Sequence, residues 1–315
     1  MIYKLKYIFY MFIFYTIICF MIFSPSSLVF ANIITSIRPL AFIAAGVVDG
    51  IMPIQILLPD GFSPHDYSLK PSDFKKIKQA DLVIWIGPDM EKFLQKPISR
   101  LSKNKHIAVT ELNSIKSLLI TDFYSKNNYF NNKDKDKNNK YRINYQYNMH
   151  VWLSPKIACI IAQSICNNLI KIYPEKKEKL RLNFYEFKKN IKQNDILVNN
   201  ILNSSRKKKY FVFHDAYSYF EKYYKLSPLG CFTINPEIQP GIKKIYQIQN
   251  QFIINKVQCI FLEPQFNSAV INNIIKKTKI NIGILDPLGI GLPIYRDSYM
   301  KFLIRLSKQY VNCLN

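Results

Sequence analysis

Six short apolar runs alternate along the chain with stretches of helical periodicity. The runs lie at 33–37, 54–58, 82–86, 210–213, 257–262 and 280–285. Apolar runs of this length are typical of strands buried in a parallel sheet, and helical stretches between them indicate β-α units. The sequence therefore predicts an α/β protein with mostly parallel sheets.

A long amphipathic segment separates the first three apolar runs from the last three. Apolar side chains recur at three-to-four spacing from Leu180 through Phe187 and Ile191 to Val198, with lysines and asparagines opposite. A helix from 174 to 202 would be about 40 Å long at 1.5 Å per residue. We therefore expect a rigid connecting helix at 174–205 that joins an N-terminal lobe, 32–173, to a C-terminal lobe, 206–315.

The first 31 residues have the pattern of an export signal. A basic start precedes an apolar run from Tyr7 to Phe23, Pro25 ends the run, and small residues close the segment at Ala31. An uncleaved membrane anchor is the alternative, because the run is close to the length of a spanning helix. We predict a signal peptide over 1–31 and an exported protein.

The chain is strongly basic, with 44 lysines and arginines against 21 acidic residues and a formal charge of +23. Such a charge can indicate a nucleic-acid or anionic-membrane partner. Here the basic residues are spread along the chain and form no arginine-rich, aromatic-interleaved element of the kind that reads nucleic acid. We assign the charge to solvated faces and expect no nucleic-acid partner.

Cysteine usage fits export to an oxidising compartment. Cys19 lies in the predicted signal segment, which leaves five cysteines in the exported chain. We expect a disulfide between Cys259 and Cys313, because it would hold a chain end that otherwise frays. Closing a loop of about fifty residues contributes roughly 4 kcal/mol in the chain-entropy model.

Three of the four histidines lie in polar phrases next to apolar runs. His65 follows the second run, His214 directly follows the fourth, and His150 precedes the apolar residues 151–153. Ligands of open α/β sheets bind beyond the carboxyl ends of the strands, where such phrases meet. Zinc takes imidazole ligands, which the fold can bring together from distant parts of the sequence. We therefore predict one metal site formed by these three histidines, and His106 has no comparable setting.

Six longer phrases carry a resemblance to a known family. They read LLPDGFSPHDYSL (57–69), NMHVWLSP (148–155), FVFHDAY (211–217), NPEIQPG (235–241), FLEPQF (261–266) and LDPLG (285–289). In this order, over essentially the whole chain after Ala31, they resemble the periplasmic zinc-binding receptors of high-affinity zinc-uptake ABC transporters. Long phrases in collinear order are far more specific than one short motif.

The resemblance implies a periplasmic receptor that captures Zn²⁺ and delivers it to a membrane permease. It places His65 and His150 in the N-terminal lobe, His214 in the C-terminal lobe and one zinc ion in the cleft between them. The Cys259–Cys313 bridge also matches the family. Manganese-selective relatives have a carboxylate at the position of His214, and imidazole is the better zinc ligand. We expect a monomer that binds zinc as its transported ligand.

Two departures from the family concern metal ligands. Zinc-binding members often have a glutamate, able to act as a fourth ligand, where this chain has Pro64. Water or another carboxylate must then complete the site, and Asp286 is our candidate, with orientation of a histidine as its alternative role. The histidine-rich loop of the family is replaced by a lysine- and asparagine-rich insert, 125–148, which lacks the apolar content to pack and is predicted to be a surface loop.

Residues beside the predicted ligands have structural expectations. We expect Glu263 to hydrogen-bond strand-end amides, with support of the cleft as the alternative, and Trp152 to pack beneath the cleft. Asp66, Tyr67 and Asp215 adjoin ligands and could orient the imidazoles.

Three other functions remain open on the sequence. They are a manganese receptor of the same class, an exported zinc hydrolase, and surface adhesion through the insert. In a hydrolase, Asp286 or Glu263 would act as the general base. The chain has no His-Glu-x-x-His, Gly-x-Ser-x-Gly or phosphate-binding glycine motif, so we expect that it is not an enzyme.

Zinc binding needs neutral imidazoles, so the affinity for zinc is expected to fall as the pH drops through the range of about 6 to 7.

Overall fold

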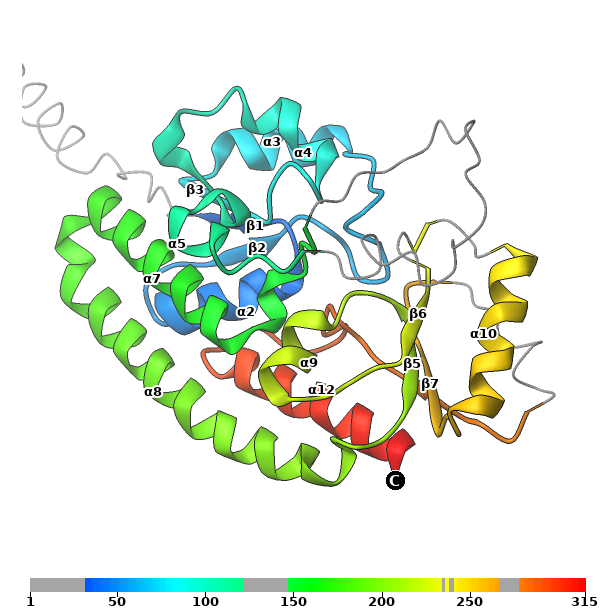
Figure 1. Ribbon diagram of the computed structural model, residues 1–315. Coiled ribbons are helices and arrows are strands. Elements are labelled where there is room, and N and C mark those ends of the chain that lie inside the picture. The colour runs from blue at the N-terminus through cyan, green and yellow to red at the C-terminus, as the bar shows by residue number, and fades with distance from the viewer. Residues whose placement is uncertain (1–31, 122–146, 234–235, 238–240, 267–277) are drawn as a thin grey trace, which may run out of the picture. The chain divides into compact units, whose positions relative to one another are not determined.

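Two parallel four-stranded sheets organise the residues that the computed structural model describes, which are 32–121, 147–233, 236–237, 241–266 and 278–315 (Figure 1). The predicted signal peptide and almost all of the insert 125–148 lie outside these ranges. Thr121 and Tyr147, on either side of the insert, form an isolated antiparallel bridge. No helix within the described ranges combines the length and the apolar character needed to cross a membrane.

The N-terminal sheet has the strand order β2-β1-β3-β4. Its strands are β1 (Ile33–Thr35), β2 (Ile54–Ile56), β3 (Leu82–Trp85) and β4 (His106–Ala108), connected by α2 (Arg38–Val48), α3 (Pro71–Gln79) and α4 (Lys92–Ile98) and followed by α5 (Asn113–Lys116). The register places Ile33 opposite both Ile54 and Leu82. β1 and β3 are buried along their whole length, as their uninterrupted apolar sequences predict.

The C-terminal sheet repeats this arrangement, with the order β6-β5-β7-β8. Its strands are β5 (Tyr210–His214), β6 (Gly230–Thr233), β7 (Cys259–Leu262) and β8 (Asn281–Ile284), and its helices are α9 (Ser218–Tyr224), α10 (Ile242–Ile254) and α12 (Ser298–Leu314). The predicted disulfide is present: Cys259 of β7 is bonded to Cys313 of α12, with 5.8 Å between their Cα atoms. The sequence patterns predict neither β4 nor β6.

Two long helices lie between the sheets in the sequence, α7 (Pro155–Ile172) and α8 (Lys177–Leu202). The predicted connecting helix is therefore confirmed, and its apolar stripe from Leu180 to Val198 is buried where α8 packs on α2, α7 and α12. Gly46 of α2 permits this close approach, because a Cβ there would lie 2.2 Å from the Phe187 ring. Short 3-10 helices complete the described chain: η1 (Lys103–Lys105), η2 (Val109–Glu111), η3 (Val151–Leu153), η4 (Pro174–Lys176) and η5 (Asn203–Ser205).

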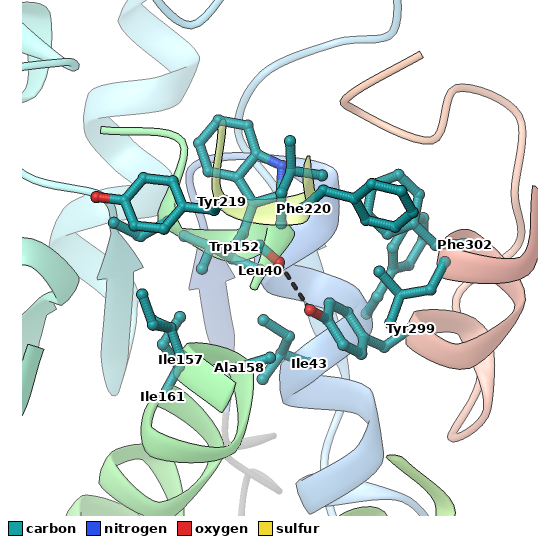
Figure 2. Packing of buried hydrophobic residues seen from close by; sticks show 14 of the residues in the cluster. Leu40, Ile43, Trp152, Ile157, Ala158, Ile161, Tyr219, Phe220, Tyr299 and Phe302 are labelled. Carbon is teal, nitrogen blue, oxygen red and sulfur yellow. Dashed lines mark hydrogen bonds between the residues drawn. The ribbon is translucent and has the colours of Figure 1, made fainter. Parts of the chain in front are cut away.

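One large apolar core includes side chains from both halves of the sequence. Figure 2 shows Trp152 among side chains of α2, α7, α9 and α12, where the Tyr299 hydroxyl donates a hydrogen bond of 2.8 Å to the Trp152 carbonyl. Because this core is continuous, residues 32–315 form one compact unit. The lobe boundaries at 173 and 206 remain a prediction.

Candidate metal centre

The three predicted histidine ligands lie close together. His214 is the last residue of β5, His65 lies in the loop after β2, and His150 immediately precedes η3. The Nε2 atom of His150 is 3.2 Å from Nε2 of His65 and 3.2 Å from Nε2 of His214. Their ligand atoms all lie within 4.8 Å of one another, and His150 and His214 are buried. Side chains from both halves of the sequence thus meet at one point.

The spacing of these nitrogens fits a tetrahedral metal ion. With zinc–nitrogen distances of about 2.0 Å, two ligands of a tetrahedral site are about 3.3 Å apart. The two measured Nε2–Nε2 distances of 3.2 Å are close to that value. Lone pairs that face one another at this distance repel, and a cation between them removes the repulsion. The arrangement can therefore bind a divalent ion through three imidazoles and leave a fourth position for another ligand.

Glu263, directly after β7, orients the ring of His214. Its Oε1 atom accepts a hydrogen bond of 2.6 Å from His214 Nδ1, and both side chains are buried. With the proton held at Nδ1, the Nε2 lone pair of His214 points into the site. Glu263 thus supports the site through the His214 ring, which was the alternative role. A hydrogen bond from the backbone amide of His214, at the end of β5, also lowers the pKa of Glu263, in line with the strand-end role expected for it.

Asn148 does the same for His150, a role that the sequence patterns do not predict. Its Oδ1 atom accepts hydrogen bonds of 2.9 Å from both the backbone N–H and Nδ1 of His150. Its Nδ2 atom donates to the carbonyl of Asp215, next to His214, at 2.7 Å. Asn148 therefore connects two ligands. The available signal was an asparagine two residues before a histidine, a position from which its side chain can bond the local backbone.

Trp152 packs beneath the site, as expected. Its ring centroid lies 5.2 Å from that of His150, and the side chain is fully buried. Its Nε1 atom donates a hydrogen bond of 2.8 Å to the carbonyl of Pro287, in the C-terminal half. The floor of the site is therefore fixed to both halves of the sequence.

The other residues expected to orient imidazoles have different contacts. The hydroxyl of Tyr67 donates to Asp73 at 3.2 Å, and Asp66 is exposed. The carboxylate of Asp215 accepts a hydrogen bond from Ser218, and its carbonyl accepts from Asn148. Orientation of the imidazoles comes instead from Glu263 and Asn148.

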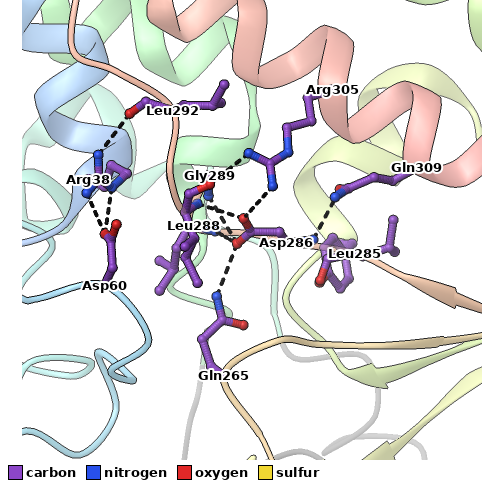
Figure 3. A network of polar contacts seen from close by, with 12 residues as sticks. Arg38, Asp60, Gln265, Leu285, Asp286, Leu288, Gly289, Leu292, Arg305 and Gln309 are labelled. Atoms are coloured by element: carbon purple, nitrogen blue, oxygen red, sulfur yellow. Dashed lines mark hydrogen bonds and ion pairs between the residues drawn. The ribbon is translucent and has the colours of Figure 1, made fainter.

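Asp286 lies in a separate polar network, which Figure 3 shows. Its carboxylate accepts hydrogen bonds from the backbone N–H groups of Leu288, Gly289 and Ile290 at 2.7–3.1 Å, and from Gln265 at 3.1 Å. Within the described ranges, the group of close ligand atoms comprises the three histidines without Asp286. In the structure this carboxylate holds the loop 286–290, and its role as the fourth ligand stays a prediction.

Burial keeps imidazoles of the site in their neutral form. It lowers the pKa of His65 to about 3, with repulsion from His214 acting in the same direction. Burial, and then His214 and His65, place the pKa of His150 well below its ordinary value. Burial raises the pKa of Glu263, and the contact with His214 opposes that shift. Because a metal binds the neutral imidazole, His65 and His150 are ready to coordinate at neutral pH.

Comparison with known proteins identifies the family of the chain. Residues 33–313 match the family model described as zinc-uptake complex component A, periplasmic. The high-affinity zinc uptake system protein ZnuA of Yersinia pestis is 46% identical over 297 residues, which cover 92% of this chain and 93% of that protein.

Two solved structures share the fold at low sequence identity. The periplasmic zinc binding protein TroA from Treponema pallidum is 17% identical, with a TM-score of 0.73 over 90% of this chain and 99% of that one. The protein FpvC from Pseudomonas aeruginosa, in complex with Mn²⁺, is 19% identical, with a TM-score of 0.72 over 90% and 98%. Since the family model matches nearly all of the chain after residue 31, the chain belongs to the family of the periplasmic component A of zinc-uptake complexes.

Proposed function

We propose that this chain is a zinc receptor: it is exported, binds Zn²⁺ through His65, His150 and His214, and delivers the ion to the permease of an ABC transporter. The observation that supports this most is the convergence of three Nε2 atoms at tetrahedral spacing. The relative from Yersinia pestis is a high-affinity zinc uptake system protein, which supports the same role. The proposed receptor acts as a monomer, with zinc as cargo.

The donor set supports zinc over manganese. Three imidazole nitrogens suit Zn²⁺, whereas Mn²⁺ prefers carboxylate, carbonyl and water oxygens. The two carboxylates considered as general base are Asp286 and Glu263. Asp286 accepts hydrogen bonds from backbone amides, and Glu263 accepts one from His214. The chain also has none of the motifs of zinc hydrolases, which supports a receptor over a zinc hydrolase. We propose water as the fourth ligand.

Calorimetric titration of the metal-stripped protein tests the assignment. We expect zinc binding tighter than about micromolar, and a loss of more than about 100-fold in His150→Ala, since even residues that orient ligands contribute 10- to 100-fold. His106→Ala is the matched control, because His106 is a half-buried histidine on β4, away from the other three. Equal affinities of the two variants would refute the site.

Competition between metals tests the choice of cargo. We expect zinc to displace manganese from the loaded protein, because the usual affinity order places Zn²⁺ above Mn²⁺ at nitrogen ligands. Preferential retention of manganese at equal concentrations would assign the chain to manganese uptake. Transfer to the permease is tested by zinc uptake in cells that have the permease and lack their own receptor, with His150→Ala as the inactive reference.

A further inference from the structure

The loop that carries His65 has few hydrogen bonds of its own. After β2, Leu58 N–H donates to the Ser36 carbonyl, and the loop then leaves the sheet. Between 59 and 66, the bonds given by its backbone amides are Phe62 N–H to the Pro59 carbonyl, at 3.3 Å, and His65 N–H to Ser63 Oγ, at 3.2 Å. The position of His65 therefore depends on side-chain contacts at the two ends of the loop.

The end after His65 is held by Tyr67. This side chain is buried, its hydroxyl donates to Asp73 at 3.2 Å, and its ring meets the rings of Phe62 and Phe93 edge-on. Asp73 belongs to α3, so this end of the loop is fixed to the N-terminal half.

The end before His65 is held by Arg38. Its Nε and Nη2 atoms donate to Oδ1 of Asp60 at 2.8 and 2.5 Å, and its Nη1 atom donates to the carbonyl of Leu292 at 2.8 Å (Figure 3). We call these three bonds the Arg38 anchor. They connect the loop of His65 to a segment 254 positions away from Arg38, in the C-terminal half.

Both attachment points of the anchor are held by further contacts. Arg38 is the first residue of α2, and the ten residues that follow it in the helix are all buried. Leu292 lies in the segment between β8 and α12, and its N–H donates to the Gly289 carbonyl at 3.1 Å. Asp286 accepts from three backbone amides of this segment, and Arg305 donates to its Ile290 carbonyl at 2.7 Å. The loop of Asp60 and His65 has fewer backbone hydrogen bonds of its own, so it is the partner whose position the anchor sets.

His65 also differs from the other two histidines in how its ring is held. His150 and His214 each donate from Nδ1 to a protein oxygen, of Asn148 and Glu263. Within the described ranges, His65 makes no corresponding bond from Nδ1 to a protein acceptor. The geometry of its ring therefore depends on the loop more than theirs does.

We propose that Arg38 is a positioning residue for His65: the Arg38 anchor holds the loop so that His65 Nε2 meets the nitrogens of the other two histidines. This inference rests on the proposed zinc site and goes beyond it. Arg38 does not touch the metal. Its removal leaves all three ligands in place and makes one of them less well positioned, which shortens the lifetime of bound zinc.

The test measures zinc release from the full protein into a chromophoric chelator by stopped flow. Arg38→Met removes charge-assisted hydrogen bonds that are partly exposed to solvent, so the loss is moderate. We expect the variant to release zinc about 5- to 30-fold faster, with little change in the rate of zinc association. Asp60→Asn should act in the same direction. Arg38→Lys, which can keep one of the two partners, should fall between Arg38→Met and the wild type.

A double-variant cycle and a control separate positioning from general stability. If the anchor acts as a unit, Arg38→Met combined with Asp60→Asn is no faster than the faster single variant. Lys301→Met, which breaks the exposed pair between Lys301 and Asp297 on α12, at 2.8 Å, should release zinc at the wild-type rate. In cobalt-loaded protein, Arg38→Met should weaken the visible absorption typical of tetrahedral nitrogen coordination, whereas Lys301→Met should not.

The outcomes distinguish this inference from the function on which it rests. Wild-type protein that binds zinc, together with unchanged release in Arg38→Met, overturns the positioning role and leaves the receptor intact. Wild-type protein that fails to bind zinc overturns both. If Arg38→Met does not fold, Asp60→Asn decides the question alone, because the Asp60 side chain is 40% exposed and its loss leaves the core unchanged.

Discussion

Replacement of Glu263 by glutamine tests how the protein prepares His214 for metal. The substitution keeps the size of the side chain and removes its charge. In the structure the Glu263 carboxylate accepts a hydrogen bond from Nδ1 of His214 at 2.6 Å, and the two side chains are 1% and 3% exposed. A glutamine that turned its NH₂ group toward Nδ1 would force the proton to Nε2, where it blocks coordination.

The expected loss follows from the type of hydrogen bond. A bond to a charged partner contributes about 1.5–3 kcal/mol and a neutral one about 0.5–1.5 kcal/mol, so the change costs about 1–2 kcal/mol. Since 1.4 kcal/mol is a factor of ten, we expect zinc affinity to fall about 5- to 30-fold. Competition with a chelator of known affinity, at neutral pH, measures this difference.

Glu221→Gln is the matched control for this experiment. Glu221 is also a buried glutamate of the C-terminal half, but it accepts hydrogen bonds from the hydroxyls of Tyr210 and Tyr310, at 2.9 and 3.1 Å. The same substitution there should leave zinc affinity at the wild-type value. If Glu263→Gln and Glu221→Gln bind zinc equally well, the argument that Glu263 sets the tautomer of His214 is wrong.

Three further predictions concern pH, packing and the disulfide. The folded-state pKa of His65 is lowered to about 3, so below pH 6.5 the unfolded chain takes up a proton that the folded chain does not. The free energy of unfolding of the metal-free protein should therefore decrease as pH falls below 6.5. Thermal unfolding from pH 7.5 to 5 should show a weaker dependence of stability on pH in His65→Gln than in the wild type. Gly46→Ala should destabilise by up to about 2 kcal/mol in urea unfolding, because overpacking against Phe187 costs about 1–3 kcal/mol and a gain in helix propensity of about 1 kcal/mol offsets part of that cost. Cys313→Ser should lower the free energy of unfolding by about 4 kcal/mol, because the disulfide closes a loop with a separation of 54 residues. A reducing agent should produce the same loss in the wild type and no further loss in the variant.

The lowered pKa also changes an expectation drawn from the sequence. An ordinary histidine site would lose zinc near about pH 6 to 7. Here burial keeps His65 and His150 neutral to lower pH, so we expect affinity to persist below that range. Titrations at pH 7 and pH 5.5 distinguish the two, since a steep loss of affinity between these two values would show that burial does not keep the imidazoles neutral.

Much of the fold could be predicted because its strongest signals are local. The apolar runs at β1, β3, β5 and β7 are strands that become buried, and the stripe from Leu180 to Val198 is the buried face of α8. β4 and β6 escaped prediction because neither lies in an apolar run as long as those that mark the other strands, and they begin at His106 and Gly230. Nothing in those tripeptide and tetrapeptide sequences distinguishes a strand at a sheet edge from a loop until its neighbours are known.

The candidate site was predictable in its ligands and not in their surroundings. His65, His150 and His214 stand beside apolar runs in phrases that resemble a known family, and the structure brings them together. Asp286 had a similar setting at the end of β8, but its carboxylate turns to the amides of its own loop. No local pattern decides between those two directions for a carboxylate.

The sequence by itself determined the order of the elements, the α/β class and the three imidazoles, because each depends on a few consecutive residues. The tertiary structure alone decided that Glu263 and Asn148 hold the rings of His214 and His150, and that Arg38 ties the loop of His65 to Leu292. Glu263 and Leu292 lie 49 and 254 positions from their partners. Contacts of that kind depend on how two sheets and a shared core pack together, and no short stretch of sequence contains that information.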